Sequence, residues 1–160
     1  MSFIKLGARV SLILLICAAT TSVRTGGITA LGKSHTDQQI KAVAVELISA
    51  EELKAKVDKN ELVTIIDVRA SSAYADSDNQ IKGAIHIKLR RLKYRLAFPP
   101  LKNVPKDREM VTYCACPSDE SSIRAAQVLM EAGFKRVRVL KGGWQAWLDA
   151  KGKVESRTKA

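Results

Sequence analysis

Two cysteines separated by a single residue are the clearest candidates for chemistry in this sequence. Cys114 and Cys116 lie between an apolar run with strand character, residues 110–113, and a stretch with a helical pattern, residues 123–132. A thiolate is a strong nucleophile, and the unpaired N–H groups and positive dipole end at a helix start favour an anion held there. The sequence therefore predicts that one of the two cysteines is a nucleophile and that its neighbours position it.

Length and charge narrow the classes of protein to consider. The chain has 160 residues, 46% of them hydrophobic, which suits one domain with a terminal appendage. Its net charge of +11 could attract nucleic acid, an anionic membrane or small anions. We find no nucleic-acid motif, no phosphate-binding glycine loop and no Cys/His spacing for a metal. We expect a solvated basic surface, no nucleic-acid partner, and neither a metal nor an organic cofactor.

Residues 1–22 have the pattern of an export signal. Lys5 and Arg9 precede an uncharged run, residues 10–23, that is rich in Leu, Ile and Ala. Because this run is shorter than the roughly 20 residues of a spanning helix, a cleaved signal is preferred over an uncleaved anchor. We predict an exported protein, periplasmic or secreted, which an uncleaved N-terminus would keep close to the membrane.

The composition then predicts a flexible linker over residues 23–39, one domain over residues 40–153 and a tail over residues 154–160. Removal of the signal leaves Cys114 and Cys116 as the only cysteines. In an oxidising compartment an idle pair of thiols is expected to form a disulfide or to be absent. A Cys-x-Cys ring is a poor structural staple, so this pair favours a redox or sulfur-handling site.

Strands and helices alternate through the predicted domain. Expected strands are 43–48, 62–66, 83–87, 109–113 and 136–140, the last with an alternation typical of an edge strand. Expected helices are 49–57, 70–75, 88–101, 123–132 and 144–151, and residues 77–82 are expected to form a polar loop. Such alternation predicts a parallel sheet covered on both faces, with its functional edge at the carboxyl ends of the strands. Asp67, Arg69, His86 and the cysteine loop all follow strands at or near that edge.

The basic segment 88–101 allows two interpretations. Leucines recur in it at helical spacing while Lys and Arg take the other positions. A basic amphipathic helix can lie on a membrane. At this length we prefer a surface helix that packs its leucines on the core.

With these elements placed, the chain resembles the rhodanese-like family of sulfurtransferase domains between residues 48 and 147. The matching pieces are 48–53 (ISAEEL), 66–69 (IDVR), 80–87 (QIKGAIHI), 111–114 (VTYC) and 139–147 (VLKGGWQAW). The resemblance implies an α/β three-layer domain with a central, mostly parallel five-stranded sheet and helices on both faces. It also implies a loop cysteine that carries sulfur as a persulfide, a small sulfur donor such as thiosulfate, and a cyanide-like or thiol acceptor, which includes protein thiols.

The loop 114–122 departs from the family pattern. Counting forward from the strand makes Cys114 the nucleophile, whereas counting back from Gly133 makes it Cys116, so the loop is longer than the common form. We prefer Cys114, because a loop absorbs extra residues more easily than a buried strand does, with Cys116 as alternative nucleophile or resolving thiol. The usual loop arginine is missing. The predicted loop and substrate-binding residues are Ala115, Pro117, Ser118, Asp119, Glu120, Ser121, Ser122 and Arg124.

The charges around this loop affect the predicted nucleophile and the binding of an anionic donor. Asp119 and Glu120 would raise the pKa of a nearby thiol and repel an anionic donor, and Arg124 could compensate. Asp67 and Arg69 are predicted as a supporting hydrogen-bonded pair rather than as catalytic groups.

Three functions follow from the loop. The first is sulfur transfer, and its alternative is a catalytically weak rhodanese-fold binding or thiol-redox module that uses the Cys114/Cys116 pair. A cysteine phosphatase is disfavoured, because Glu120 or Ser122 stands where its arginine is needed. The sequence predicts no oligomeric state.

Overall fold

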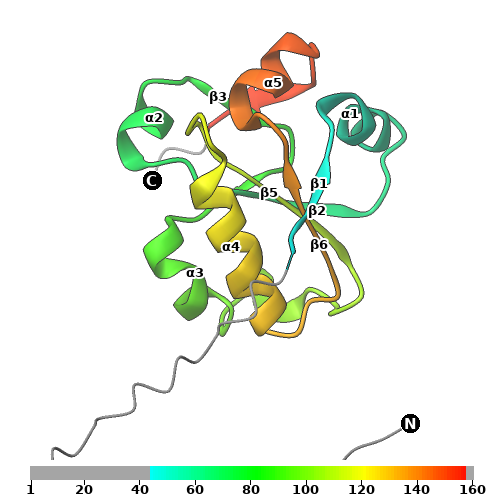
Figure 1. The fold of residues 1–160 in the computed structure, drawn as a ribbon, viewed down its shortest axis with the longest axis vertical. Helices are drawn as coiled ribbons and strands as arrows, with labels where there is room; N and C mark the ends of the chain where they lie inside the picture. The colour runs from blue at the N-terminus through cyan, green and yellow to red at the C-terminus, as the bar shows by residue number, and fades with distance from the viewer. Residues whose placement is uncertain (1–43, 158–160) are drawn as a thin grey trace, which may run out of the picture. The chain divides into compact units, whose positions relative to one another are not determined.

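A computed structural model describes residues 44–157, so the predicted signal 1–22 and linker 23–39 lie outside the described residues. Its centre is a five-stranded, fully parallel sheet with strand order β1-β6-β5-β2-β4 (Figure 1). The strands are β1 (Glu46–Ile48), β2 (Val63–Asp67), β4 (Ile85–His86), β5 (Glu109–Tyr113) and β6 (Arg136–Leu140). Between residues 44 and 157, no helix is both long enough and apolar enough to cross a membrane.

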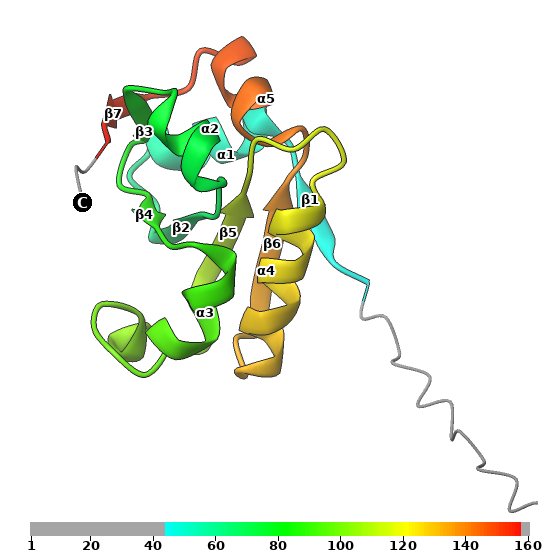
Figure 2. The same ribbon diagram turned by 90° about the vertical axis from the view of Figure 1, so that its left-hand side faces the viewer.

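Helices cover both faces of this sheet (Figure 2). On one face lie α1 (Ala50–Asp58) and α5 (Gly143–Asp149), and on the other lie α3 (Leu89–Arg95) and α4 (Glu120–Glu131). The short helix α2 (Ser71–Ala75) follows β2, and a 3-10 turn, η1 (Leu101–Asn103), follows α3. The predicted α/β fold with a covered parallel sheet is confirmed.

The two central strands, β2 and β5, place polar side chains together at the functional edge. β2 begins with four β-branched residues, and every residue of β5 is buried, as expected for strands covered on both faces. Their register sets Asp67 opposite Tyr113 on β5, and opposite His86 on β4. Three neighbouring strands therefore end with polar groups side by side.

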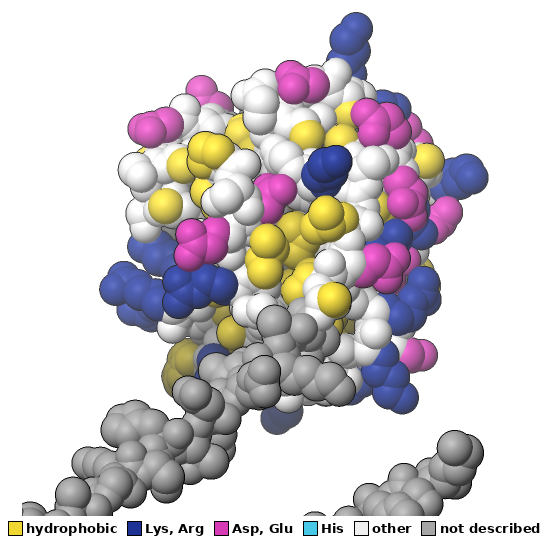
Figure 3. All heavy atoms as spheres, in the orientation of Figure 1, with side chains coloured by type: hydrophobic (Ala, Val, Ile, Leu, Met, Phe, Trp, Pro, Cys, Tyr) yellow, Lys and Arg dark blue, Asp and Glu magenta, His cyan; other side chains and the backbone are white. Residues whose placement is uncertain are grey.

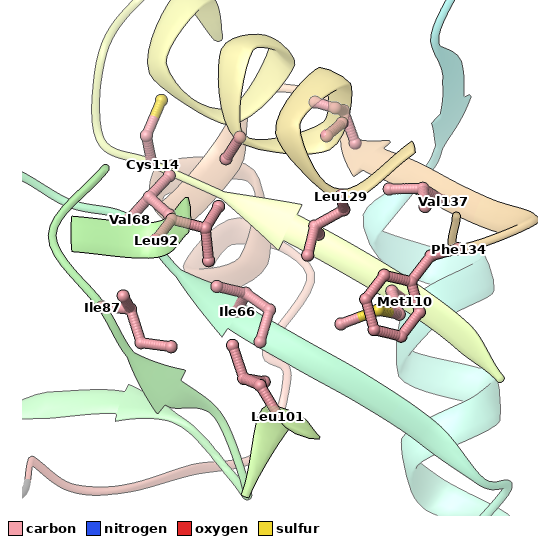
Figure 4. Packing of buried hydrophobic residues seen from close by; sticks show 13 residues of the cluster. Ile66, Val68, Ile87, Leu92, Leu101, Met110, Cys114, Leu129, Phe134 and Val137 are labelled. Carbon is pink, nitrogen blue, oxygen red and sulfur yellow. The ribbon is translucent and has the colours of Figure 1, made fainter. Parts of the chain in front are cut away.

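One of the two hydrophobic cores reaches the cysteine loop. It lies between the sheet and the pair α3–α4, and Figure 4 shows Met110 and Cys114 at its opposite ends. Leu92 of α3 is fully buried in this core, which confirms the packing predicted for the leucines of the basic segment. The helix is shorter than predicted, however, because α3 ends at Arg95.

A second, two-stranded sheet corrects the prediction of a polar loop over residues 77–82. This segment contains β3 (Asn79–Ile81), which pairs antiparallel with β7 (Val154–Ser156), a strand within the predicted tail 154–160. Gln80 is buried in β3, and its amide donates to the Ala84 carbonyl (2.8 Å) and to Glu155 (3.0 Å). A polar segment can enter the interior in this way because its buried amide is hydrogen-bonded.

The edge position predicted for residues 136–140 is wrong, because β6 lies inside the sheet between β1 and β5. Its alternating pattern comes from Arg136 and Arg138, which reach acidic partners. The Arg138 side chain is 13% exposed and forms ion pairs with Glu52 (2.7 Å) and Glu109.

Glu109 is the centre of an ion-pair cluster at the edge of the sheet opposite the cysteine loop. Its side chain is 6% exposed and contacts Arg138, Lys56 (3.3 Å) and Arg136 (3.2 Å). Burial raises the pKa of Glu109, but hydrogen bonds and charge attraction from Arg138 and Lys56 outweigh burial and hold this pKa below its ordinary value. Arg136 contributes less, because its side chain is 63% exposed.

The substitution Glu109→Gln should destabilise the domain at neutral pH by about 3 kcal/mol, because it leaves partly buried cations unpaired. A carboxylate with a lowered pKa stabilises the fold above its unfolded pKa, about 4.3, and this contribution disappears as the pH falls through the folded pKa. Urea unfolding at pH 7 and in acid should therefore show a difference from wild type that shrinks on acidification. The control Glu61→Gln removes an exposed partner of Lys56 and should shift stability by less than about 0.5 kcal/mol.

Candidate active site

Cys114 follows β5 directly, so the central strand of the sheet sets its position. The residue is 1% exposed and belongs to the core between the sheet and α3–α4. A disulfide joins it to Cys116, which is half-buried in the loop. The structure thus shows the two candidate thiols in their oxidised state.

Two polar groups lie against the Cys114 sulfur. The Cys116 N–H is 3.4 Å from Cys114 Sγ, and the hydroxyl of the buried residue Ser122 is 3.5 Å from it. The proton of this hydroxyl is donated to the Asp119 carbonyl at 2.8 Å, which fixes the place of Ser122 in the first turn of α4. A reduced Cys114 would hold its thiolate beside an N–H donor and the positive end of a helix, and both favour an anion.

The start of α4 differs from the prediction. The helix was predicted over residues 123–132, but it begins at Glu120, and Asp119 precedes it in a left-handed conformation with φ of 53°. The Asp119 side chain does not cap α4 but accepts the Gly142 N–H at 2.8 Å. One oxygen of its carboxylate is therefore held by the backbone that opens α5.

Residues 142–144 hold the cysteine loop from the other side, a role that the sequence analysis did not predict. The Trp144 N–H donates to the Cys114 carbonyl at 2.8 Å. Gly143 packs on the same carbonyl, which a Cβ at this position would strike. Gly143 also has φ of +50°, so both its conformation and its surroundings favour glycine. The run Gly142-Gly143-Trp144 is the sequence feature that could have indicated this role.

Asp67 and Arg69 form a completely buried ion pair near the cysteine loop. The Asp67 carboxylate accepts from Arg69 Nη2 (2.7 Å), from the Arg69 backbone N–H (3.0 Å) and from the Tyr113 hydroxyl (2.6 Å). Burial raises the pKa of Asp67, but the neighbouring His86, Arg69 and Tyr113 outweigh burial and hold this pKa below its ordinary value. The pKa of Tyr113 is raised above its ordinary value, chiefly because the side chain is buried. At neutral pH the Asp67 carboxylate is therefore ionised and the tyrosine is neutral.

This ion pair connects to the cysteine loop through an aromatic ring. The Arg69 guanidinium lies 4.4 Å from the centre of the Trp144 ring, and the Trp144 N–H holds Cys114. Tyr113, bonded to Asp67, is the residue before Cys114. Asp67 and Arg69 thus position the loop and do not contact the sulfur atoms through any hydrogen bond that the described residues form.

The other predicted loop residues divide by exposure. Ala115, Pro117 and Ser118 face solvent, as does Glu120, and Ser121 is half-buried. Arg124 is exposed, and its Nη1 lies 3.9 Å from Glu120 Oε1. The two acidic residues of the loop are therefore each matched by a donor, Asp119 by Gly142 and Glu120 by Arg124.

A parallel α/β domain with a cysteine between its central strand and α4 defines the class of this protein. The profile of the Rhodanese-like domain matches residues 49–150, and the chain belongs to that family. It is 31% identical over 103 residues to a protein named "Sulfurtransferase" from Allochromatium vinosum, covering 64% of this chain and 88% of that protein.

Two solved structures share the fold. One is the Alr3790 protein from Anabaena, with 33% identity and a TM-score of 0.58, covering 69% of this chain and 82% of that one. The other is a protein named thiosulfate sulfurtransferase from Pseudomonas aeruginosa, with 25% identity and a TM-score of 0.57. That similarity covers 71% of this chain and 21% of the Pseudomonas chain.

The substitution Gly143→Ala should displace the Cys114 carbonyl and slow the reaction of the reduced Cys114 thiol by about 10- to 100-fold, because small displacements of a reacting group are costly. The measurement is the rate of alkylation by iodoacetamide after reduction. Gly133→Ala is the matched control: Gly133 has φ of +90°, and its Cβ would meet no atom within 4 Å. Equal rates for the two variants would contradict the role of Gly143.

Proposed function

We propose that this chain is a sulfurtransferase that carries sulfane sulfur as a persulfide on Cys114. Membership of the rhodanese-like family and the sulfurtransferase relatives support this class of reaction. The observation that carries the assignment to Cys114 is the position of its sulfur, between the Cys116 N–H and the Ser122 hydroxyl at the start of α4. A thiolate needs a donor such as this N–H, and so does the terminal sulfur of a persulfide.

The reaction requires the reduced loop. The Cys114 thiolate attacks the outer sulfur of a donor such as thiosulfate; a new S–S bond forms, and the S–S bond of the donor breaks and releases sulfite with its electron pair. An acceptor nucleophile, cyanide or a thiolate, then attacks the terminal sulfur of the persulfide. The bond between the two sulfurs breaks, and Cys114 leaves as a thiolate ready for the next cycle.

Cys114 is the better nucleophile on structural grounds. Its backbone is fixed by β5 on one side and by the Trp144 N–H on the other, whereas Cys116 lies in the loop. The contribution of Cys116 in this scheme is its backbone N–H, which any residue except proline supplies.

The test uses Cys114→Ser and Cys116→Ser in protein reduced beforehand. Formation of thiocyanate from thiosulfate and cyanide should fall to background in Cys114→Ser, because serine cannot form a persulfide. The same activity should persist within about threefold in Cys116→Ser, because the N–H donor remains. Mass spectrometry should find one added sulfur atom on Cys114. Turnover that depends on Cys116 and not on Cys114 would reverse the assignment.

The disulfide favours a second candidate, a thiol-redox module that uses the same pair. The Cys116 thiolate can attack the inner sulfur of the Cys114 persulfide, form the Cys114–Cys116 disulfide that the structure shows and expel hydrosulfide. A dithiol reductant must then supply two electrons to reopen the loop. We also propose export, on residues 1–22; an oxidising compartment would preserve this disulfide.

Release of hydrosulfide separates the two candidates. If the pair resolves the persulfide, wild-type protein loaded with sulfur and freed of donor should emit hydrosulfide while losing its persulfide and the free Cys116 thiol. The Cys116→Ser variant should keep its persulfide until an acceptor is added. A stable persulfide on wild-type protein would support the simple transferase and exclude resolution by Cys116.

A further inference from the structure

A basic pocket of about 420 Å³ opens beside the cysteine loop. It lies between the turn after β2, the start of α3 and the first turn of α4. Its lining includes three exposed cations, Lys88, Arg90 and Arg124, and two serines, Ser71 and Ser121. None of the described residues that line it is acidic.

We propose that this pocket binds a tetrahedral oxyanion, a sulfonyl or phosphoryl group, through Lys88, Arg90 and Arg124. Binding of the anion does not depend on sulfur transfer. Its use as the seat for the charged half of a sulfur donor rests on the proposed function. The residues that recognise the anion lie outside the cysteine loop, at the start of α3 and on α4.

The cations of α3 are available for such a ligand. Within residues 44–157, neither Lys88 nor Arg90 forms an ion pair, and α3 contains no acidic residue. Figure 3 shows Lys and Arg side chains gathered over α3 at the left of the molecule. Arg124 has a partner in Glu120, but both side chains are exposed and such pairs are weak, so an anion can compete for the guanidinium. Hydrogen bonds from cations to an oxyanion are shorter and stronger than neutral ones.

The pocket is close to the reacting sulfur. Ser121 in its wall precedes Ser122, whose hydroxyl is 3.5 Å from Cys114 Sγ. Val68, another wall residue, belongs to the same core cluster as Cys114. Neither Asp119 nor Glu120 lines the pocket. Cations on α3 can therefore replace the missing loop arginine, and the acidic residues of the loop do not block the anion.

Arg90 and Arg91 provide a matched pair of variants. They are neighbours on α3, both exposed and both arginine, yet Arg91 lines a different hollow of about 310 Å³ with His86 and Arg95. Lys88 borders both hollows. Arg90→Gln and Arg91→Gln thus remove the same charge from the same helix and test which hollow binds the anion.

The experiment is calorimetric titration of the full chain carrying Cys114→Ser, which cannot turn over thiosulfate. Sulfate, thiosulfate and inorganic phosphate are added in separate titrations. Arg90→Gln should weaken binding about tenfold, the loss expected for one charge-assisted contact. Arg91→Gln should change it less than about twofold. Tighter thiosulfate binding would assign the pocket to a sulfur donor, and tighter phosphate binding would assign it to a phosphoryl ligand. No binding at millimolar concentrations, or equal losses in both variants, would overturn the proposal.

Activity with Cys114 intact separates this inference from the proposed function. If the pocket seats the donor, Arg90→Gln should raise the KM for thiosulfate about tenfold and leave the second step, transfer to cyanide, unchanged. Anion binding without any sulfur transfer would support the pocket as an anion-binding site and contradict the proposed sulfurtransferase function. Transfer with normal KM in Arg90→Gln would overturn the donor role of the pocket.

Discussion

The buried ion pair between Asp67 and Arg69 is the interaction on which the cysteine loop depends. Desolvation of two charges is expensive, so such a pair persists only where additional hydrogen bonds satisfy it. Here Tyr113 supplies one to Asp67, and the Asn79 carbonyl accepts one from Arg69 at 3.0 Å. The pair thereby connects β2, β5 and the small β3–β7 sheet. Loss of either charge would leave the other buried without a partner, at a cost of about 3–5 kcal/mol.

Charge clusters fix β5 at both of its ends. Glu109 begins the strand among cations that it draws from α1 and β6, and Tyr113 ends it on the Asp67 carboxylate. Every residue of the strand is buried. A shift in its register would therefore move the polar residues at its ends into the apolar core. The position of Cys114 is thus a property of the sheet.

Local signals in the sequence predict the parts of the fold that local physics determines. The β-branched run of β2 and the apolar β5 were found because burial on both faces requires such residues. The pairing of β3 with β7 was missed, since Gln80 and Glu155 are 75 residues apart and a polar segment gives no sign of a distant partner. β6 was read as an edge because its arginines alternate, and only the acidic partners on other elements explain their place inside the sheet. The role of Gly143 was missed as well, because its contact with Cys114 depends on how α5 meets the loop.

The difference between local sequence signals and contacts in space also explains the unusual charge of the cysteine loop. Read along the chain, two acidic residues beside a candidate thiolate are unfavourable, because negative charge raises a thiol pKa and repels an anionic donor. In space, the Asp119 carboxylate is held by the Gly142 N–H, and the cations of α3 stand at the pocket that borders the loop. Asp119 therefore serves to attach the loop to α5, a role a positive side chain could not perform with a backbone N–H. Once an acidic residue holds that place, positive charge for an anion has to come from elements outside the loop, and α3 and Arg124 supply it.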